Sequence, residues 1–105
     1  MAEWVDVCGE GELDDGAMTT VDVGGELVAV ARSNGSYYAF DDTCTHEECS
    51  LSEGILTGTE VDCPCHGSVF DLRTGEALVG PALESVQTYR VRVEAGRIQV
   101  SEHQP

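Results

Sequence analysis

Two Cys–His pairs stand out as residues that could bind a metal. One residue separates Cys44 from His46, and two residues separate Cys63 from His66. Thiolates suit iron and zinc, and imidazoles suit metals of intermediate character, so this set predicts a metal site. Its two candidate occupants are a single zinc ion and a [2Fe–2S] cluster with both cysteines on one iron and both histidines on the other.

The distribution of sulfur and nitrogen over two segments distinguishes these occupants. Zinc fingers usually keep Cys with Cys and His with His, about two to four residues apart. Here each segment offers one sulfur and one nitrogen, as a binuclear cluster requires if each loop must reach both irons. The spacing favours the cluster, with zinc as the alternative. With two thiolates and two neutral imidazoles the oxidised cluster carries no net charge, so it accepts one electron at roughly −150 to +300 mV.

The residues around the pairs resemble the Rieske iron–sulfur family. The resemblance rests on Cys-Thr-His at 44–46 and Cys-Pro-Cys-His-Gly-Ser at 63–68. In addition, Gly-Pro-Ala at 80–82 resembles the proline loop that closes over the cluster in that family, with Pro81 as its proline. The matched segment runs from about residue 40 to residue 89. The resemblance implies a Rieske fold and one [2Fe–2S] cluster.

Residue by residue, the resemblance implies a ligand set. Cys44 and Cys63 would bind the buried iron, and His46 and His66 would bind the outer iron. Because imidazole tolerates water, we expect the histidine end to be exposed and to face an electron-transfer partner. Oxidised iron lowers the pKa of the free ring nitrogens, so we expect the midpoint potential to fall with rising pH only at alkaline pH.

Further positions resemble the high-potential members of the family. In those members the residues at Cys49 and Cys65 form a disulfide that joins the two cluster loops. Ser68 stands where they place a hydroxyl donor to a bridging sulfide, but Phe70 stands where they carry a tyrosine that also donates. Hydrogen bonds to the sulfurs and nearby charge tune such a cluster. We therefore predict a middle potential, above that of simple oxygenase ferredoxins and below that of respiratory Rieske proteins.

The charge of the chain excludes some classes of partner. The chain has twenty acidic residues, five arginines and no lysine, and its net charge is −15. Nucleic acid and anionic membrane surfaces would be repelled. The sequence has no apolar run of about 18 residues that could span a membrane. The acidity is explained either by solubility or by steering toward partners with basic docking faces.

The elements that position the metal site read as strands. Gly24-Gly25 and Asn34-Gly35 predict two tight hairpins, and Ala95-Gly96 predicts a third reversal. We expect residues 51–58 to form a turn-rich connection and a short helical turn near 81–85. The predicted strands cover residues 4–7, 18–23, 26–32, 37–40, 60–63, 69–71, 77–78, 86–94 and 97–101.

This pattern predicts an all-β fold, an antiparallel sandwich or small barrel. Residues 1–105 would form one domain, in which residues 44 to about 72 are an inserted cluster-binding subdomain. Alternation in the strand predicted at 86–94 places Tyr89, Val91 and Val93 inward. We expect Cys8 to be a lone, half-buried thiol.

The first predicted function is a soluble one-electron carrier. It resembles the ferredoxins of bacterial ring-hydroxylating dioxygenase systems, which take electrons from a flavin reductase and pass them to a terminal oxygenase in aromatic hydrocarbon catabolism. The alternatives are a subunit of a fixed complex, such as the small subunit of nitrite reductase or the electron-entry subunit of a monooxygenase, and a zinc-stabilised binding module. No catalytic set stands outside the ligands, so we expect no enzyme. The first residues lack an export signal, which favours a cytoplasmic location. A role as a shuttle favours a monomer.

Overall fold

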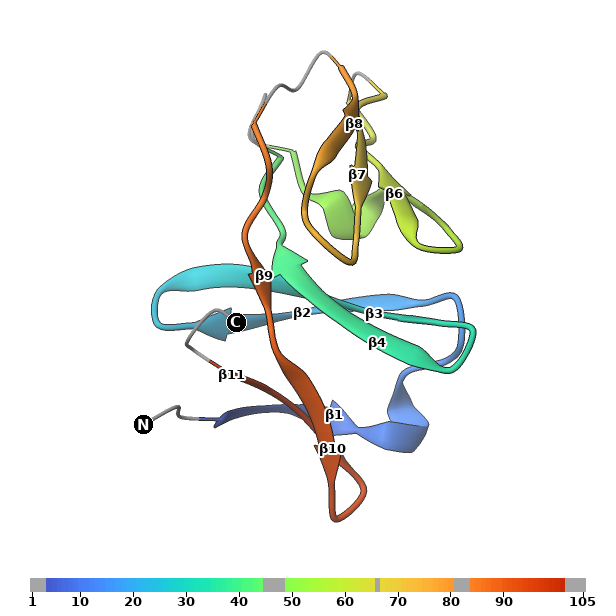
Figure 1. The fold of residues 1–105 in the computed structure, drawn as a ribbon. Helices are drawn as coiled ribbons and strands as arrows, with labels where there is room; N and C mark the ends of the chain where they lie inside the picture. Colours follow the sequence, from blue (N-terminus) through green and yellow to red (C-terminus); the bar gives the residue numbers. More distant parts are fainter. Residues whose placement is uncertain (1–3, 45–48, 66, 81–83, 102–105) are drawn as a thin grey trace.

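The computed structural model describes residues 4–44, 49–65, 67–80 and 84–101. Figure 1 shows two sheets at the bottom, which we call the base, and a third above them, which we call the upper sheet. The base sheets have the orders β1-β11-β10 and β2-β3-β4-β9, and the upper sheet has the order β5-β6-β7-β8. Every pairing is antiparallel, which confirms the predicted all-β fold.

The elements have the following bounds. The base strands are β1 (Trp4–Gly9), β2 (Met18–Val23), β3 (Glu26–Ser33), β4 (Ser36–Asp41), β9 (Thr88–Tyr89), β10 (Val91–Glu94) and β11 (Arg97–Ser101). The upper strands are β5 (Ile55–Thr57), β6 (Glu60–Asp62), β7 (Val69–Asp71) and β8 (Ala77–Val79), and the short 3-10 helices are η1 (Glu10–Glu12) and η2 (Leu51–Glu53).

The predicted hairpin turns are confirmed. Asn34 and Gly35 both have positive φ, 53° and 79°, between β3 and β4. Gly24 and Gly25 have φ of 59° and 92° between β2 and β3. Two consecutive positive φ values give a turn whose twist matches that of the flanking strands, which is why Gly and Asn occupy these positions.

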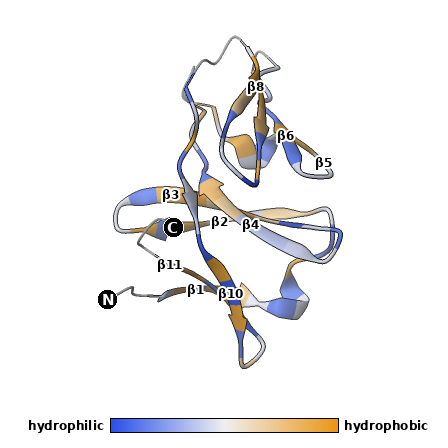
Figure 2. Cartoon of the chain, in the orientation of Figure 1, coloured by the Kyte–Doolittle hydropathy of each residue, from blue (hydrophilic) through white to orange (hydrophobic). Residues whose placement is uncertain are grey.

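Strand β3 is buried on both faces. Val28 and Val30 belong to a core between the base sheets, while Ala29 and Ala31 belong to a second core beneath the upper sheet. All four side chains are fully buried. Side chains alternate across a strand, so a continuous apolar run is what a strand between two cores requires. Figure 2 shows the sheet that contains β3 with the upper sheet on one side and the β1-β11-β10 sheet on the other.

Three expectations need correction. The connection predicted at residues 51–58 contains η2 and the strand β5. The single strand predicted at residues 86–94 is two strands, β9 and β10, which belong to different sheets. Val93 lies on the predicted face, as the register partner of buried Ile98, but it is 37% exposed, so its expected burial is wrong. The cause is that β10 lies at the edge of its sheet, where β11 covers one side only.

The remaining expectations on burial hold. Tyr89 is buried, Val91 packs partly buried against the base core, and Cys8 is a half-buried free thiol. The short helical turn expected near residues 81–85 falls largely outside the described residues. Among the residues that the structure describes, no helix is long and apolar enough to cross a membrane.

Candidate metal centre

The structure brings the two candidate cysteine ligands into one core. Cys44 follows the end of β4 and Cys63 follows the end of β6. Each is only 4% exposed, neither takes part in the Cys49–Cys65 disulfide, and both belong to the core beneath the upper sheet. His46, His66 and Pro81 lie outside the described residues, so within those residues no group of three or more candidate ligands is found.

The backbone closes the two cysteine loops in the same way. In loop 1, residues 44–49, the Cys44 N–H donates to the carbonyl of the last residue, Cys49, at 2.9 Å. In loop 2, residues 63–68, the Cys63 N–H donates to the carbonyl of the last residue, Ser68, at 2.7 Å. A bridging pair flanks each loop, Thr43 with Ser50 and Asp62 with Val69. Each loop is therefore a six-residue turn that begins with a cysteine.

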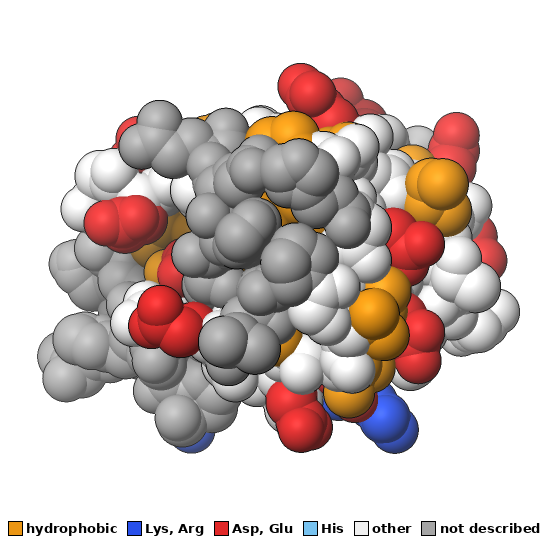
Figure 3. All heavy atoms as spheres, turned by 90° about the horizontal axis from the view of Figure 1, so that it is seen from above, with side chains coloured by type: hydrophobic (Ala, Val, Ile, Leu, Met, Phe, Trp, Pro, Cys, Tyr) orange, Lys and Arg blue, Asp and Glu red, His pale blue; other side chains and the backbone are white. Residues whose placement is uncertain are grey.

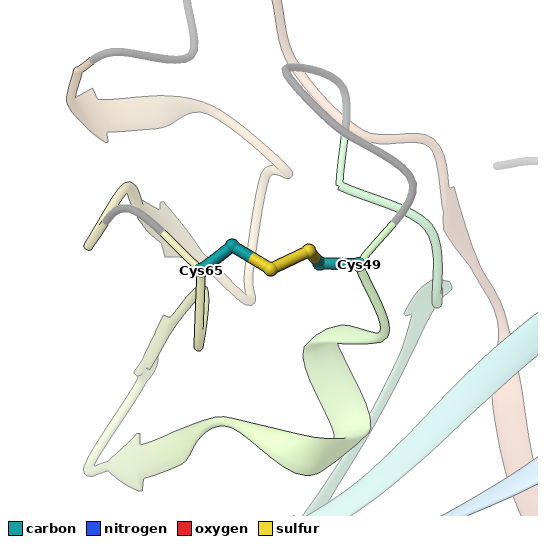
Figure 4. Close-up of a disulfide and its surroundings, with 2 residues drawn as sticks. All are labelled: Cys49 and Cys65. Atoms are coloured by element: carbon teal, nitrogen blue, oxygen red, sulfur yellow. A yellow bond between two sulfur atoms is a disulfide. The ribbon is translucent and has the colours of Figure 1, made fainter.

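A disulfide joins the two loops to each other. Cys49, the last residue of loop 1, is bonded to Cys65 of loop 2, with their Cα atoms 6.4 Å apart. Figure 4 shows this bond spanning the space between the two segments. Cys65 is exposed and Cys49 is half-buried, so the bond lies at the surface while Cys44 and Cys63 lie beneath it.

Loop 1 is supported by a buried carboxylate, Asp42, which was not among the predicted site residues. Asp42 is 1% exposed and accepts a hydrogen bond from the Ser52 N–H at 2.8 Å. Its backbone N–H donates to Leu27 O, and its carbonyl accepts from the Leu51 N–H. Asp42 thereby ties η2 and β3 to the residue pair that precedes Cys44. Its position two residues before the candidate ligand Cys44 is the sequence feature that could have identified it.

Two further contacts fix the ends of strands near the loops. The Tyr89 hydroxyl donates to Asp41 Oδ1 at 2.6 Å, and burial together with this bond raises the pKa of Tyr89. The Arg73 side chain donates to both oxygens of Asp71 at 3.1 and 2.9 Å, and these bonds lower the pKa of that carboxyl. Each carboxylate belongs to the last residue of a strand, β4 before loop 1 and β7 after loop 2.

The residues expected to tune the cluster are buried. Ser68 is 1% exposed and Phe70 is fully buried in the core that also contains Cys44 and Cys63. The hydroxyl of Ser68, which is expected to affect the potential of the cluster, therefore lies inside the protein. The other position offers an aromatic ring without a hydroxyl.

The donor set fits an iron–sulfur cluster. Two buried thiols lie on two loops that are held together by a disulfide, and the sequence adds one histidine to each loop. Soft thiolates select iron–sulfur clusters or zinc, and the mixed S–N composition of each loop suits two irons.

The comparisons identify the family. The model of the Rieske [2Fe-2S] domain matches residues 3–90, and the chain belongs to this family. It carries one Rieske [2Fe–2S] cluster, which decides against the zinc alternative, and it is an electron-transfer protein rather than a catalytic oxygenase.

Its relatives are ferredoxins of dioxygenase systems. The ferredoxin component of the naphthalene 1,2-dioxygenase system of Pseudomonas aeruginosa is 36% identical, over 93% of this chain and 94% of that protein. The ferredoxin of carbazole 1,9a-dioxygenase from Nocardioides aromaticivorans IC177 superposes with a TM-score of 0.89 at 35% identity, over 92% and 95% of the two chains. A chain of a solved complex of reduced oxygenase and oxidized ferredoxin in carbazole 1,9a-dioxygenase gives a TM-score of 0.91 at 35% identity, over 97% and 95%.

Proposed function

We propose that Cys44, Cys63, His46 and His66 hold the cluster. The buried thiols of the two cysteines support their assignment to the inner iron, and the family motif supports the assignment of the two histidines to the outer iron. When bound, the cluster accepts and releases one electron at a time. The protein supplies two loops closed by backbone hydrogen bonds and joined by the Cys49–Cys65 disulfide, with Ser68 at the end of loop 2. The family resemblance of residues 80–82 supports a role for Pro81 in covering the cluster.

The chain acts, in this proposal, as a separate carrier in a bacterial ring-hydroxylating dioxygenase system. It takes electrons from a flavin-dependent reductase and passes them to a terminal oxygenase that hydroxylates an aromatic ring. Relatives of nearly the same length that are named as ferredoxin components support a separate carrier over a subunit of a fixed complex. The carrier is a cytoplasmic monomer, formed by a single domain of residues 1–105 with residues 44–72 as its cluster-binding part.

The charge of the molecule supports partners with basic docking faces. The sequence has no arginine or lysine between Arg32 and Arg73, while its net charge is −15. Figure 3, which views the molecule from above, shows acidic side chains on several sides of this face and, among the residues that it colours by type, arginines only along the lower edge. Opposite charge on a partner speeds association and makes the rate fall with ionic strength.

The single observation that carries the proposal is the pair of buried cysteines on two disulfide-linked loops in a Rieske chain of ferredoxin length. Reconstitution tests it. Purified protein is combined with a flavin reductase, NADH and a panel of terminal oxygenases that includes the carbazole oxygenase, and product is measured with and without the protein. Product that depends on the protein supports the proposal. A protein whose cluster is reduced by dithionite, but which supports no oxygenase in the panel, counts against this role.

The ligand assignment has its own test. Cys44→Ser and Cys63→Ser should each abolish the visible absorption of the cluster, while Cys8→Ser should leave it intact, because Cys8 lies on β1 in the base. Full visible absorption in either ligand variant would falsify the assignment.

A further inference from the structure

A row of three apolar residues and one aspartate crosses the outer face of the upper sheet. Ile55, Asp62, Val69 and Val79 are register partners from strand to strand. The next row, with Phe70 and its partners, faces the buried core. Because neighbouring residues of a strand point to opposite faces, the row containing Ile55 faces away from that core.

The apolar side chains at the two ends of this row are exposed to solvent. Ile55 is 65% exposed and Val79 is 52% exposed, and Leu78, the extra residue at the irregular β7–β8 pairing, is 43% exposed. These are three of the five large hydrophobic residues that are exposed among the described parts of the chain. Figure 2 shows β8 coloured as hydrophobic at the top of the molecule. Exposed apolar side chains gathered on one face mark an interaction surface.

A pocket adjoins the row on the side of loop 2. Its volume is about 420 Å³, and its lining includes Ile55 and Asp62 of the row. The pocket is also lined by Glu53 of η2 and by three residues of loop 2, Cys63, Pro64 and Gly67. The pocket therefore connects the row to a loop that carries a proposed iron ligand.

The charge around this surface is negative. Glu53 and Asp62 line the pocket, and no ion pair is found for either among the described residues. The arginine nearest in sequence, Arg73, is paired with Asp71. Figure 3 shows acidic side chains beside hydrophobic ones on this end of the molecule. A complementary surface has apolar side chains at its centre and a basic side chain that reaches the pocket.

We propose that this surface, formed by Ile55, Leu78, Val79 and the Glu53–Asp62 pocket, docks the terminal oxygenase. The inference rests on the proposed function and extends it from the loops to the outer face of β5–β8. The oxygenase places apolar side chains on the row and an arginine or lysine in the pocket. The surface is a docking site for a protein, because the pocket is open and adjoins a row across four strands in which three apolar residues flank one carboxylate, Asp62.

The test uses the oxygenase that the reconstitution experiment identifies. The double variant Ile55→Thr/Val79→Thr keeps β-branched side chains but removes the apolar contact. Its apparent KM as electron donor to the oxygenase should rise about fivefold or more, with kcat unchanged, because buried apolar anchors dominate interfaces. Glu53→Gln should raise the KM by a smaller factor that disappears at high salt.

Matched controls lie in the base. Leu27→Thr removes an exposed hydrophobic residue (45% exposed) from β3, and Glu10→Gln removes an exposed charge from η1. Neither should change the KM. The rate of reduction by the flavin reductase and the midpoint potential should stay at wild-type values in the double variant, which separates docking from a damaged cluster.

Three outcomes would overturn the inference. One is an unchanged KM for the oxygenase in the Ile55→Thr/Val79→Thr variant. Another is a rise confined to the reductase reaction, which would assign the surface to the reductase. A third is a wild-type dimer in sedimentation that the double variant converts to a monomer, which would assign the surface to a second copy of the chain. A chain that transfers no electrons to any oxygenase would instead refute the proposed function.

Discussion

Gly54 offers a direct test of how the upper sheet positions loop 2. It follows η2, and its φ of −86° and ψ of −159° suit any residue, so conformation does not require glycine here. Space does. A Cβ at Gly54 would lie 1.9 Å from the carbonyl oxygen of Asp62, the residue directly before Cys63. In the Gly54→Ala variant β6 must therefore move by about 1.5 Å to restore an ordinary contact of 3.4 Å.

The cost can be estimated from two contributions. Overpacking typically costs about 1–3 kcal/mol. Weakening one hydrogen bond of the β5–β6 ladder, where Ile55 pairs with Asp62, adds about 1 kcal/mol. A loss of about 3 kcal/mol corresponds to a Tm lower by about 15 °C for a domain of this size. Because the displaced carbonyl precedes Cys63, cluster content per protein should fall as well.

The assay compares Gly54→Ala with Gly11→Ala. A Cβ at Gly11 would meet nothing within 4 Å, and its φ is not positive, so this control should keep a wild-type Tm. Thermal unfolding is followed by circular dichroism at one scan rate, and cluster content by visible absorption. Equal Tm and equal cluster content in the two variants would refute the reasoning that β6 holds loop 2 through this contact.

Three further predictions concern the loops and their surroundings. Cys49→Ser/Cys65→Ser removes a link across 16 residues, so it should lower stability by about 3 kcal/mol and cluster retention during purification. Ser68→Ala should lower the midpoint potential in protein-film voltammetry, and an unchanged potential would exclude a hydroxyl contribution. Because Arg73 lowers the pKa of Asp71, the stability from this pair is present above about pH 4 and is lost as the pH falls further. Arg73→Gln should therefore lower the Tm at pH 7 but not near pH 2, as thermal scans across pH would show.

The sequence predicted the parts of the fold that depend on local chemistry. The Asn34-Gly35 turn was predictable because both residues accept positive φ. The burial of Cys44 and Cys63 agrees with the assignment of thiolates to the inner end of the site. The double burial of β3 could be expected from its continuous apolar run.

Other features depend on tertiary contacts that local patterns do not encode. Ile55–Thr57 is too short for its periodicity to be recognised, and it forms a strand because β6 pairs with it. Val93 alternates correctly with its neighbours, but β10 lies at a sheet edge and leaves it exposed. Asp42 reads as a polar loop residue, yet it is buried because the Ser52 N–H needs an acceptor.

The two-faced strand β3 packs residues of the 44–72 segment against the base. Its valines, Val28 and Val30, fill the base core, whereas its alanines, Ala29 and Ala31, leave room on the other face. On that face Phe40 of β4 joins side chains of the upper sheet and both buried cysteines in one core. Residues 44–72 alone would lack this wall and expose the core beneath Cys44 and Cys63. The loops are thus fixed at their ends by backbone hydrogen bonds and from below by the base, so a loss of packing on β3 must reach the metal site.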